Sequence, residues 1–491
     1  MPLAAFADDE AGGDVERGKH VTSRTANLFD KESRGHQGIH LARGWTLEKR
    51  THSVFSSGWF LVFVLFWAAL VAYLDRGIVA VLIPDLRQSL GISEVQVSLI
   101  QGISFSLFFA LAGLPIGWLA DHYNRRNLLI VGLAAWSIMT IACGFAQNFW
   151  QLFAARAGVG IGEAVLAPAA YSMISDLFAP WKRGKPMAII GIGYSIGGAG
   201  AAILAGLVMN ALEGTKGVAL PIFGLMESWR VIFLIAGAPG IVVLAMMLTL
   251  REPIRGLSGQ TAGGDNGFVR FLSTRWRVFL PLYSALVCPP LVGLVSSSWA
   301  AVILIRNFGF TVGDAGLTLG AALLISNLGG SFAGGVIGDW LVSRGRASGR
   351  LPVFYIGTLP AIVGGLCMAY GQFLWLFLLS QILVVVTASV LSAAAYPTLH
   401  EVVPLQLRGR SVALHALNMN LLGIGLGTMA VAMLTQYVFQ DERMVHRSVA
   451  IVVLIASVVA PILILLQRKG YEALRIQFTT NGVLTPERCP R

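Results

Sequence analysis

The chain has 491 residues, of which 55% are hydrophobic and only 12% are charged. A soluble domain carries roughly a quarter charged residues, so this chain has too few to cover a water-soluble body of its size. A bilayer removes the need for a polar exterior, and apolar stretches of the roughly 20 residues that cross one recur along the chain. The composition therefore predicts an integral membrane protein and excludes a soluble one.

The formal charge of +11 comes largely from short loops between apolar stretches. That distribution is typical of a membrane-orientation signal and argues against nucleic acid as a partner. Residues 1–57 are polar and lack the apolar core of roughly 7–15 residues found in secretory signals, so we predict a disordered cytoplasmic tail. The four cysteines have neither metal-site nor disulfide spacing, and we predict no metal and no cofactor.

Twelve segments are apolar and long enough to span a bilayer, which predicts an all-α membrane protein with twelve transmembrane helices. The turns Gln147-Asn148 and Gly371-Gln372 divide two pairs of segments that otherwise read as single long spans. The predicted spans are residues 58–83, 97–120, 128–146, 149–175, 185–211, 229–250, 277–305, 314–338, 351–370, 372–400, 409–436 and 446–467.

The Lys and Arg residues of the loops are unevenly divided between the two sides of the membrane. With the N-terminus inside, fifteen of them lie in inner loops and six in outer loops. Cytoplasmic loops carry such an excess of positive charge. We therefore expect both termini to be cytoplasmic. The membrane that we expect the protein to occupy is the plasma membrane, which in a bacterium is the inner membrane.

A polar, basic segment at residues 251–276 divides the chain into a first bundle at 58–250 and a second at 277–467, with a cytoplasmic tail at 468–491. The two halves echo each other. The second span closes on Gly117-Trp-Leu-Ala-Asp121, and the eighth closes on Gly335-Val-Ile-Gly-Asp339. Two pseudo-symmetric six-helix bundles are the layout of a transporter class that binds its substrate between the halves near the membrane midplane.

The strongest motif runs from Gly117 to Leu128 and includes Asp121, Arg125 and Arg126. Gly117 permits close approach of a neighbouring helix. Asp121 places a negative charge where the N-terminus of a neighbouring helix presents partial positive charge. We expect Arg125 to pair with carboxylates of the same cytoplasmic cluster. An ordinary charged loop that follows the positive-inside rule is the alternative.

This motif resembles the loop signature of the major facilitator superfamily, G-x-L-A-D-R-x-G-R-R/K. The chain departs from it at His122 and Asn124, where Arg and Gly are commoner. The resemblance implies the major facilitator fold, and a cytoplasmic gate at Gly117, Asp121, Arg125 and Arg126 that latches the two halves in the outward-open state.

The fourth span contains two charged residues, Arg156 and Glu163. A charge inside a bilayer is costly unless it is paired or hydrated, and it marks a functional site by default. Their spacing of seven residues places both on one helical face, about 10 Å apart along the axis. We predict a proton or substrate site, with a structural ion pair between helices as the alternative.

The first span carries Asp75 and Arg76. Asp75 and Arg156 lie at equal depth from the outer ends of their spans, so we expect them to be in contact. Neighbours on a helix diverge by about 100°, so one of the two residues in the first span can instead tie two helices together.

Isolated polar residues in other spans are candidates for lining the cavity, although a lone polar residue in a bundle more often satisfies a neighbour. They are Tyr194, Asn327, His415 and Asn418. The glycine run from Gly191 to Gly200 is similar to an antiporter signature of the superfamily but lacks its proline, which leaves symport and antiport both open.

Tyr73-Leu-Asp75-Arg76, the Gly117–Arg126 loop, the Arg156–Glu163 segment and Asp176-Leu-Phe178 together resemble the spinster family. The resemblance implies a secondary transporter coupled to protons through Glu163, aided by Arg156, Asp75 and Arg76. It also implies a sphingolipid- or lysophospholipid-like substrate.

We therefore predict alternating access by a proton-coupled transporter of an amphipathic substrate, with Arg76, Glu163, Tyr194, Asn327, His415 and Asn418 as candidate substrate contacts. Its expected partners are the bilayer, a small amphipathic molecule and protons, and we expect a monomer. A transporter of a small organic anion or drug is the first alternative, and a non-transporting receptor or scaffold is the second. The chain has neither a Walker A nor an HExxH motif, so nothing in the sequence supports an ATP-driven pump or an intramembrane metalloprotease. A membrane enzyme is the third alternative, but no nucleophile–base pair or metal cluster at matching depth supports it, and we expect no enzyme activity.

Overall fold

The computed structural model describes most of the chain from residue 58 onward. The predicted N-terminal tail at residues 1–57 lies outside the described residues, as do residues 481–491 of the predicted C-terminal tail. The described ranges are residues 58–179, 182–212, 217–220, 224–254, 266–344, 348–404 and 407–480.

Within these ranges twelve helices are long and apolar enough to cross a membrane, which confirms the predicted fold class. The first half contains α2 (Gly58–Val81), α3 (Ile83–Leu90), α4 (Glu94–Ser98), the π-helix η2 (Leu99–Ile103), α5 (Ser104–His122), α6 (Arg125–Phe145), α7 (Phe149–Glu163), α8 (Leu166–Leu177), α9 (Gly184–Ala211), β1 (Val218–Leu220), β2 (Gly224–Met226) and α10 (Ser228–Thr249).

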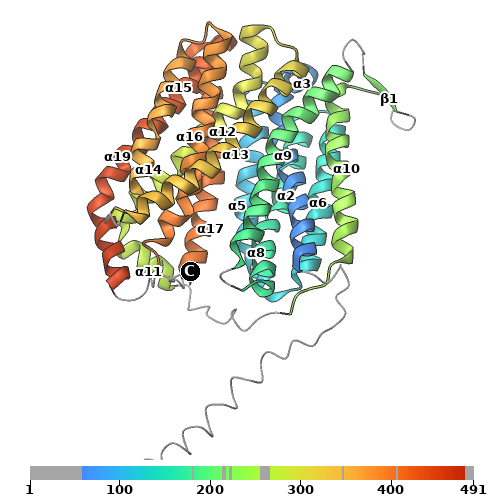
Figure 1. Cartoon of the computed structure of the whole chain (residues 1–491). Helices are drawn as coiled ribbons and strands as arrows, with labels where there is room; N and C mark the ends of the chain where they lie inside the picture. Colours follow the sequence, from blue (N-terminus) through green and yellow to red (C-terminus); the bar gives the residue numbers. More distant parts are fainter. Residues whose placement is uncertain are drawn as a thin grey trace, which may run out of the picture. The chain divides into compact units, whose positions relative to one another are not determined.

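The second half contains α11 (Asn266–Thr274), α12 (Trp276–Phe308), α13 (Val312–Ser343), α14 (Leu351–Gly357), α15 (Leu359–Ala369), α16 (Leu374–His400), α17 (Arg408–Asn418), the π-helix η6 (Met419–Leu426), α18 (Gly427–Met433), η7 (Leu434–Phe439), the 3₁₀ turn η8 (Glu442–Met444) and α19 (Val445–Thr480). Figure 1 shows the first half in blue to green on one side and the second half in yellow to red on the other.

The helix boundaries follow from local chemistry. Asn124 and Asn148 cap α6 and α7, because each side chain accepts a hydrogen bond from the backbone N–H three residues later. The fourth span is divided at Ala164, where Pro168 cannot donate the backbone hydrogen bond that a continuous helix needs. This division places Glu163 at the last position of α7.

We call the end of the bundle that carries the Gly117–Arg126 loop the motif end, and the end that carries α3 and the β1–β2 hairpin the far end (Figure 1). The strands of this hairpin are antiparallel, with Val218 opposite Met226. The hairpin, α3 and the linker helix α11 are additions to the twelve predicted spans, and α19 continues to Thr480, so residues 468–480 are helical.

The hydrophobic core is shared by the two halves at one end only. One buried cluster includes residues from both, such as Ile78 and Phe233 from the first half and Trp299 and Phe377 from the second. The two other clusters each belong to a single half. The first of these surrounds Trp136. The halves therefore pack together toward the far end and have separate cores toward the motif end.

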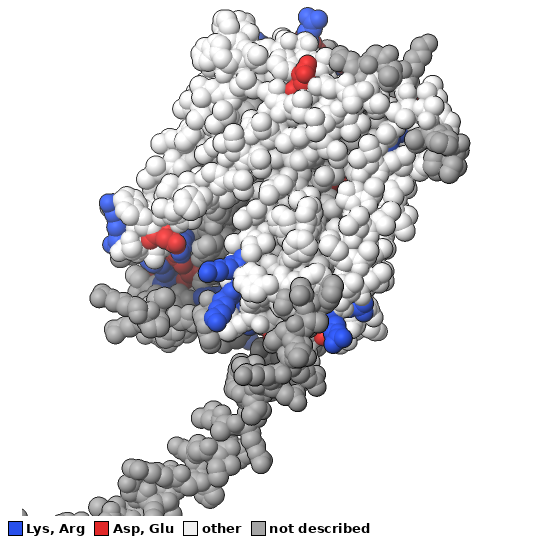
Figure 2. All heavy atoms as spheres, turned by 45° about the vertical axis from the view of Figure 1, so that its right-hand side comes forward, with Lys and Arg blue, Asp and Glu red and all other residues white. Residues whose placement is uncertain are grey.

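The outer surface suits a bilayer. Figure 2 shows charged side chains at the two ends of the described part and an almost uncharged flank between them. Large apolar side chains on the spans are exposed, including Val131, Ile138 and Leu466, which are 66%, 59% and 73% exposed. Lipid tails would cover such a surface, whereas a soluble monomer rarely exposes a continuous one.

Candidate functional site: a central cavity with a buried ion pair

A cavity of about 390 Å³ lies between the two halves. Its first-half wall contains the charged and aromatic residues Tyr73, Arg76, Phe105, Arg156 and Tyr194. Its second-half wall is uncharged and contains small hydroxyl and amide side chains among apolar ones: Ser297, Ser298, Asn327, Ser331, Ser389 and Ser392. The cavity is therefore electrostatically one-sided, with its cationic groups on the first half.

Arg76 of α2 and Glu163 of α7 form an ion pair beside this cavity. Arg76 Nε donates to Glu163 Oε2 at 2.7 Å, and Arg76 Nη2 lies 2.7 Å from the same oxygen. The Glu163 side chain is 1% exposed and that of Arg76 is 17% exposed, so the arginine is the member that reaches into the cavity. The guanidinium also lies 4.2 Å from the ring centroid of Phe105, a distance at which the ring attracts a cation.

The Arg76–Glu163 pair is costly to break because Glu163 is buried. Removing one member of a buried ion pair leaves the other charge without a partner, at a cost of about 3–5 kcal/mol. Protonation of Glu163 has the same electrostatic consequence for Arg76. Glu163 Oε1, the other oxygen of this carboxylate, has no hydrogen-bond partner among the described residues.

Arg156 lies on the same face of α7 as Glu163, as their spacing predicts. Its hydrogen-bond partner is a backbone oxygen and not the carboxylate of Glu163 or Asp75. Its Nη1 donates to the backbone oxygen of Asp75 at 3.2 Å and not to the Asp75 carboxylate. Within the described part of the chain, Arg156 is paired with no carboxylate, although its side chain is buried and contributes to the cavity wall. A buried guanidinium of this kind can donate hydrogen bonds to an anionic group of a ligand.

Asp75 points away from the cavity, into the interior of the first half. Its Oδ2 accepts a hydrogen bond from Thr140 Oγ1 of α6 at 2.9 Å, and the residue is 1% exposed. It therefore ties α2 to α6, while Arg76, about 100° further around α2, faces the cavity. The expected contact with Arg156 exists through the Asp75 backbone, so the two side chains do not form an ion pair.

The other predicted ligand contacts divide into two groups. Tyr194 and Asn327 line the cavity. The Tyr194 ring lies 4.6 Å from that of Tyr73, and Asn327 Oδ1 accepts from Ser389 Oγ at 2.9 Å. His415 and Asn418 do not line it. His415 is 2% exposed, and its ring packs edge-on against Tyr396 within the second half.

The serine residues of the second-half wall were not among the predicted contacts. Serine is a common small residue at helix–helix contacts in membranes, so a single serine in a span does not mark a cavity. The consecutive residues Ser296, Ser297 and Ser298 in α12 are the one sequence signal that marks this wall. Gln101 of η2 also lines the cavity, and its Nε2 donates to the Ser298 backbone oxygen at 3.5 Å, between the two halves.

At the motif end, Arg125 is buried in an ion-pair cluster, as expected from the sequence. Its guanidinium lies 2.5 Å from Asp176 Oδ2 and 2.8 Å from Glu252 Oε1, and it donates to Ser172. The backbone N–H of Arg126 also donates to Glu252, at 2.8 Å. This cluster joins the start of α6 to the end of α8 and the residues after α10, all within the first half.

Gly117 and Asp121, the two residues of the predicted gate that precede Arg125, lie outside this cluster. A Cβ atom placed on Gly117 would meet nothing within 4 Å, so the close helix contact that we expected there is not formed in this conformation. Asp121 is exposed. The open space beside Gly117 agrees with the separate cores of the two halves toward this end.

The second half repeats the arginine cluster of the first. Arg350 Nη2 lies 2.7 Å from Asp339 Oδ1, and its Nη1 lies 2.6 Å from Glu401 Oε1. Glu401 also pairs with Arg475 at 3.0 Å and accepts from Tyr471, which attaches the helical extension of α19. Arg350 with Glu401 thus corresponds to Arg125 with Asp176. Among the ion pairs described, Asp339 takes part in the second cluster only.

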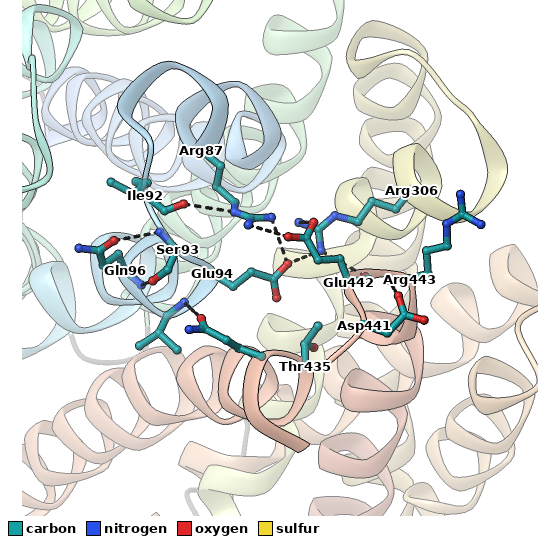
Figure 3. Close-up of polar contacts among 12 residues, drawn as sticks. Arg87, Ile92, Ser93, Glu94, Gln96, Arg306, Thr435, Asp441, Glu442 and Arg443 are labelled. Carbon is teal, nitrogen blue, oxygen red and sulfur yellow. Dashed lines mark hydrogen bonds and ion pairs between the residues drawn. The ribbon is translucent and has the colours of Figure 1, made fainter. Parts of the chain in front are cut away.

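At the far end a charge network joins the two halves (Figure 3). Glu94, at the start of α4, accepts from Arg306 of α12 and from Arg87 of α3, the latter at 3.4 Å. Glu442 of η8 completes the network, 2.7 Å from Arg87 and 3.3 Å from Arg306. Beside it, the Val95 N–H donates to Gln436 at 3.2 Å. Among the described residues, the ion pairs that connect the two halves all lie at this end.

The sequence model of the Major Facilitator Superfamily matches residues 65–347, which is more than half of the chain. The chain therefore belongs to the major facilitator superfamily and is an integral membrane protein. Protein spinster homolog 1 from Homo sapiens is 32% identical over 200 residues, which cover 40% of this chain and 35% of that protein. The match thus spans about a third of this curated relative's length.

A solved structure agrees over a much longer stretch. A bacterial homolog of the human lysosomal transporter spinster, in an inward-facing and unoccupied conformation, superposes with a TM-score of 0.68 at 25% identity. The superposition covers 87% of this chain and 98% of that one. Within the superfamily the chain is spinster-like. A probable L-galactonate transporter from Escherichia coli (strain K12) is 36% identical over 134 residues, 27% of this chain and 29% of that protein.

Proposed function

We propose that the chain is a proton-coupled secondary transporter that works by alternating access and moves an amphipathic substrate with an anionic head group. The observation that carries this proposal is the one-sided cavity, in which Arg156 has no carboxylate partner among the described residues and Arg76 is held by Glu163. Lipids of the sphingolipid or lysophospholipid type are the substrate class that we favour.

The first step of the proposal concerns the conformational state of the structure, inward-facing or outward-facing. The halves share a core and a charge network at the far end, and they have separate cores at the motif end. If the motif end is cytoplasmic, as the distribution of Lys and Arg predicts, this arrangement is inward-facing. The spinster homolog with which the chain superposes is itself described as inward-facing, which supports this assignment.

Proton coupling is the second step. Protonation of Glu163 removes the negative charge that holds Arg76, and the freed guanidinium can then bind the anionic head group of a substrate. Binding of proton and substrate is linked in this scheme, because the carboxylate of Glu163 and the substrate anion compete for one arginine. A ligand that binds one of two states more tightly shifts the population toward that state.

The substrate class is the third step. Arg76 and Arg156 place two cationic groups on the first-half wall, while the facing wall offers neutral hydroxyl groups between apolar residues such as Leu294 and Leu323. Arginine matches phosphate and carboxylate geometry with paired hydrogen bonds. The cavity of about 390 Å³ is within the usual range for small-ligand sites, and it accommodates a head group with an adjoining apolar segment.

A small organic anion is the second candidate, because the same two arginines suit a carboxylate. The similarity to a probable L-galactonate transporter favours this candidate over an uncharged drug. The two candidates differ in their need for apolar surface. A hydroxylated acid would use the serines and Asn327 of the second-half wall, whereas a lysolipid would use its leucines.

The experiment that tests the proposal is uptake into proteoliposomes, with lysophosphatidate and galactonate as the two probes. We expect accumulation of lysophosphatidate that depends on a pH gradient and is lost in Arg156→Gln, whereas Arg447→Gln, an exposed arginine at the far end, leaves it unchanged. Accumulation of galactonate alone would transfer the proposal to the second candidate. Equal uptake by both variants would overturn the role of Arg156.

A further inference from the structure

A group of arginines and aromatic residues lies outside the cavity, where α11 leads into α12. Arg270, Arg275 and Arg277 fall within eight positions of the chain, together with Phe271 and Trp276. We call these five residues the linker patch. In Figure 1, α11 lies at the motif end of the second half. No role in transport follows from the cavity for any of them.

The linker patch is fixed to the second half by apolar packing. The ring of Phe271 lies 5.2 Å from that of Phe279, a buried residue of α12. α19 packs directly on the same turn of α12, because a Cβ atom on Gly470 would come within 2.5 Å of Val278. The helix α11 is therefore held against the membrane-spanning bundle.

The patch also lies at the boundary of the apolar surface. α12 is one of the twelve candidate spans and begins at Trp276. Trp276 is 55% exposed, and Leu280, one turn further along the same face, is 60% exposed. Tryptophan is enriched at membrane–water interfaces, where one part of the ring is apolar and the indole N–H is hydrated. The exposed side of this turn thus faces lipid at the level of the head groups.

The three arginines of the patch carry charge that the described part of the protein does not neutralise. None of them is in an ion pair with a described carboxylate; Arg275 makes one long hydrogen bond, from Nη1 to Thr274 Oγ1 at 3.4 Å. Arg275 lies over the ring of Phe271 at 4.8 Å, and Arg277 lies over that of Trp276 at 5.6 Å. Cation–ring contacts at these distances use none of the N–H donors of a guanidinium, so most of the donors of Arg275 and Arg277 have no partner among the described residues.

Arg270 and Arg275 line one open hollow with Gly267, Phe271 and Thr274. Two guanidinium groups at one hollow are suited to a phosphate, which accepts paired hydrogen bonds from each. Basic side chains immediately next to a spanning helix attract the anionic lipids of the adjacent leaflet. We propose that the linker patch binds the head group of an anionic phospholipid from the leaflet at the motif end.

This assignment makes a quantitative statement about lipid preference. Each arginine near an anionic membrane surface contributes about a fivefold factor in affinity. Neutralising Arg270 and Arg275 should therefore lower the preference for an anionic lipid over a zwitterionic one by about 25-fold at low salt, and by less at high salt, because exposed charges are screened.

The test uses the full-length protein, purified from a mixture of phosphatidylglycerol and phosphatidylcholine, with retained lipids counted by native mass spectrometry. We expect the parent to retain phosphatidylglycerol preferentially and Arg270→Gln/Arg275→Gln to lose most of that preference. Arg443→Gln/Arg447→Gln carries the same change in charge at exposed positions of the far end and should behave as the parent. Arg270→Lys/Arg275→Lys should retain most of the preference, which separates loss of charge from misfolding.

Two results would overturn the assignment. The first is an equal preference for phosphatidylglycerol in the parent and both glutamine variants, or an equal loss in both. The second is displacement of the lipid by millimolar inorganic phosphate, which would show a site for free phosphate and not for a lipid.

Discussion

The charge network at the far end makes a direct prediction about the conformational equilibrium. Glu94 is 3% exposed and accepts from both Arg87 and Arg306, which come from opposite halves of the protein. Glu94→Gln removes the charge and leaves Arg306 with Glu442, at 3.3 Å, as its remaining carboxylate partner in the network. We expect this change to weaken the contact that holds the far end closed.

The expected size of the effect follows from the burial of the network. Exposed ion pairs contribute about 0.2–1 kcal/mol, and breaking a buried one costs about 3–5 kcal/mol. The arginines here are 21% and 12% exposed, so an intermediate value of about 2 kcal/mol applies. Since about 1.4 kcal/mol is a factor of ten, the ratio of the two states changes by about 30-fold. A parent that is about 99% closed at the far end would become roughly three-quarters closed.

The assay is a distance measurement between spin labels placed at His122 and Ser343, which are exposed on opposite halves at the motif end. In Glu94→Gln a population with a shorter distance should appear, because opening the far end brings the motif ends together. Glu472→Gln breaks an ion pair within α19 alone and is the matched control. An unchanged distance distribution in Glu94→Gln would refute the reasoning.

Burial and the nearby Glu227 carboxylate raise the pKa of Asp85 to about 6. The folded state therefore penalises the charged form, so this group's penalty is absent below about pH 4, grows between about pH 4 and 6 and is fully present above that range. Asp85→Asn should stabilise the detergent-solubilised protein by about 1–2 kcal/mol at about pH 7.5 and little at about pH 4, which thermal unfolding measures; equal gains at both pH values would contradict this. Gly316→Leu should open the far end, since a Cβ atom there would lie 2.6 Å from the Ala202 backbone oxygen of the other half. Gly335→Leu, on the same helix with nothing within 4 Å, should not, and equal behaviour of these two variants in the spin-label assay would count against close packing as the cause.

Much of the fold followed from the sequence because a bilayer imposes simple rules on length and polarity. The predicted spans match the observed helices to within a few residues at most ends, and the turns before Phe149 and Leu374 divide the long segments as expected. The short helices α3 and α11 were not predicted, because an eight- or nine-residue segment gives no length signal. The extension of α19 was missed because a polar segment after a span gives no membrane-helix signal. The ion pair between Arg475 and Glu401 that stabilises it is a tertiary contact, which the local sequence does not reveal.

The candidate site was harder to predict than the fold. Helical spacing placed Arg156 and Glu163 on one face, but a single helix does not reveal that Arg76 of another helix is the partner of Glu163. Likewise, adjacency in sequence did not show which of Asp75 and Arg76 faces the cavity. The packing of α2 against α6 decides this, because Thr140 holds the Asp75 carboxylate inside the first half. Pairing between helices is a tertiary property that no local pattern contains.

The coupling role of the Arg76–Glu163 pair is tested most directly by measuring transport in Glu163→Gln with and without a pH gradient. The glutamine keeps the shape of the side chain but carries no charge to hold Arg76, and it cannot exchange a proton. We expect proteoliposomes with this variant to exchange labelled substrate across the membrane as the parent does, while an imposed pH gradient no longer drives accumulation. Gradient-driven accumulation equal to that of the parent would contradict the proposed coupling.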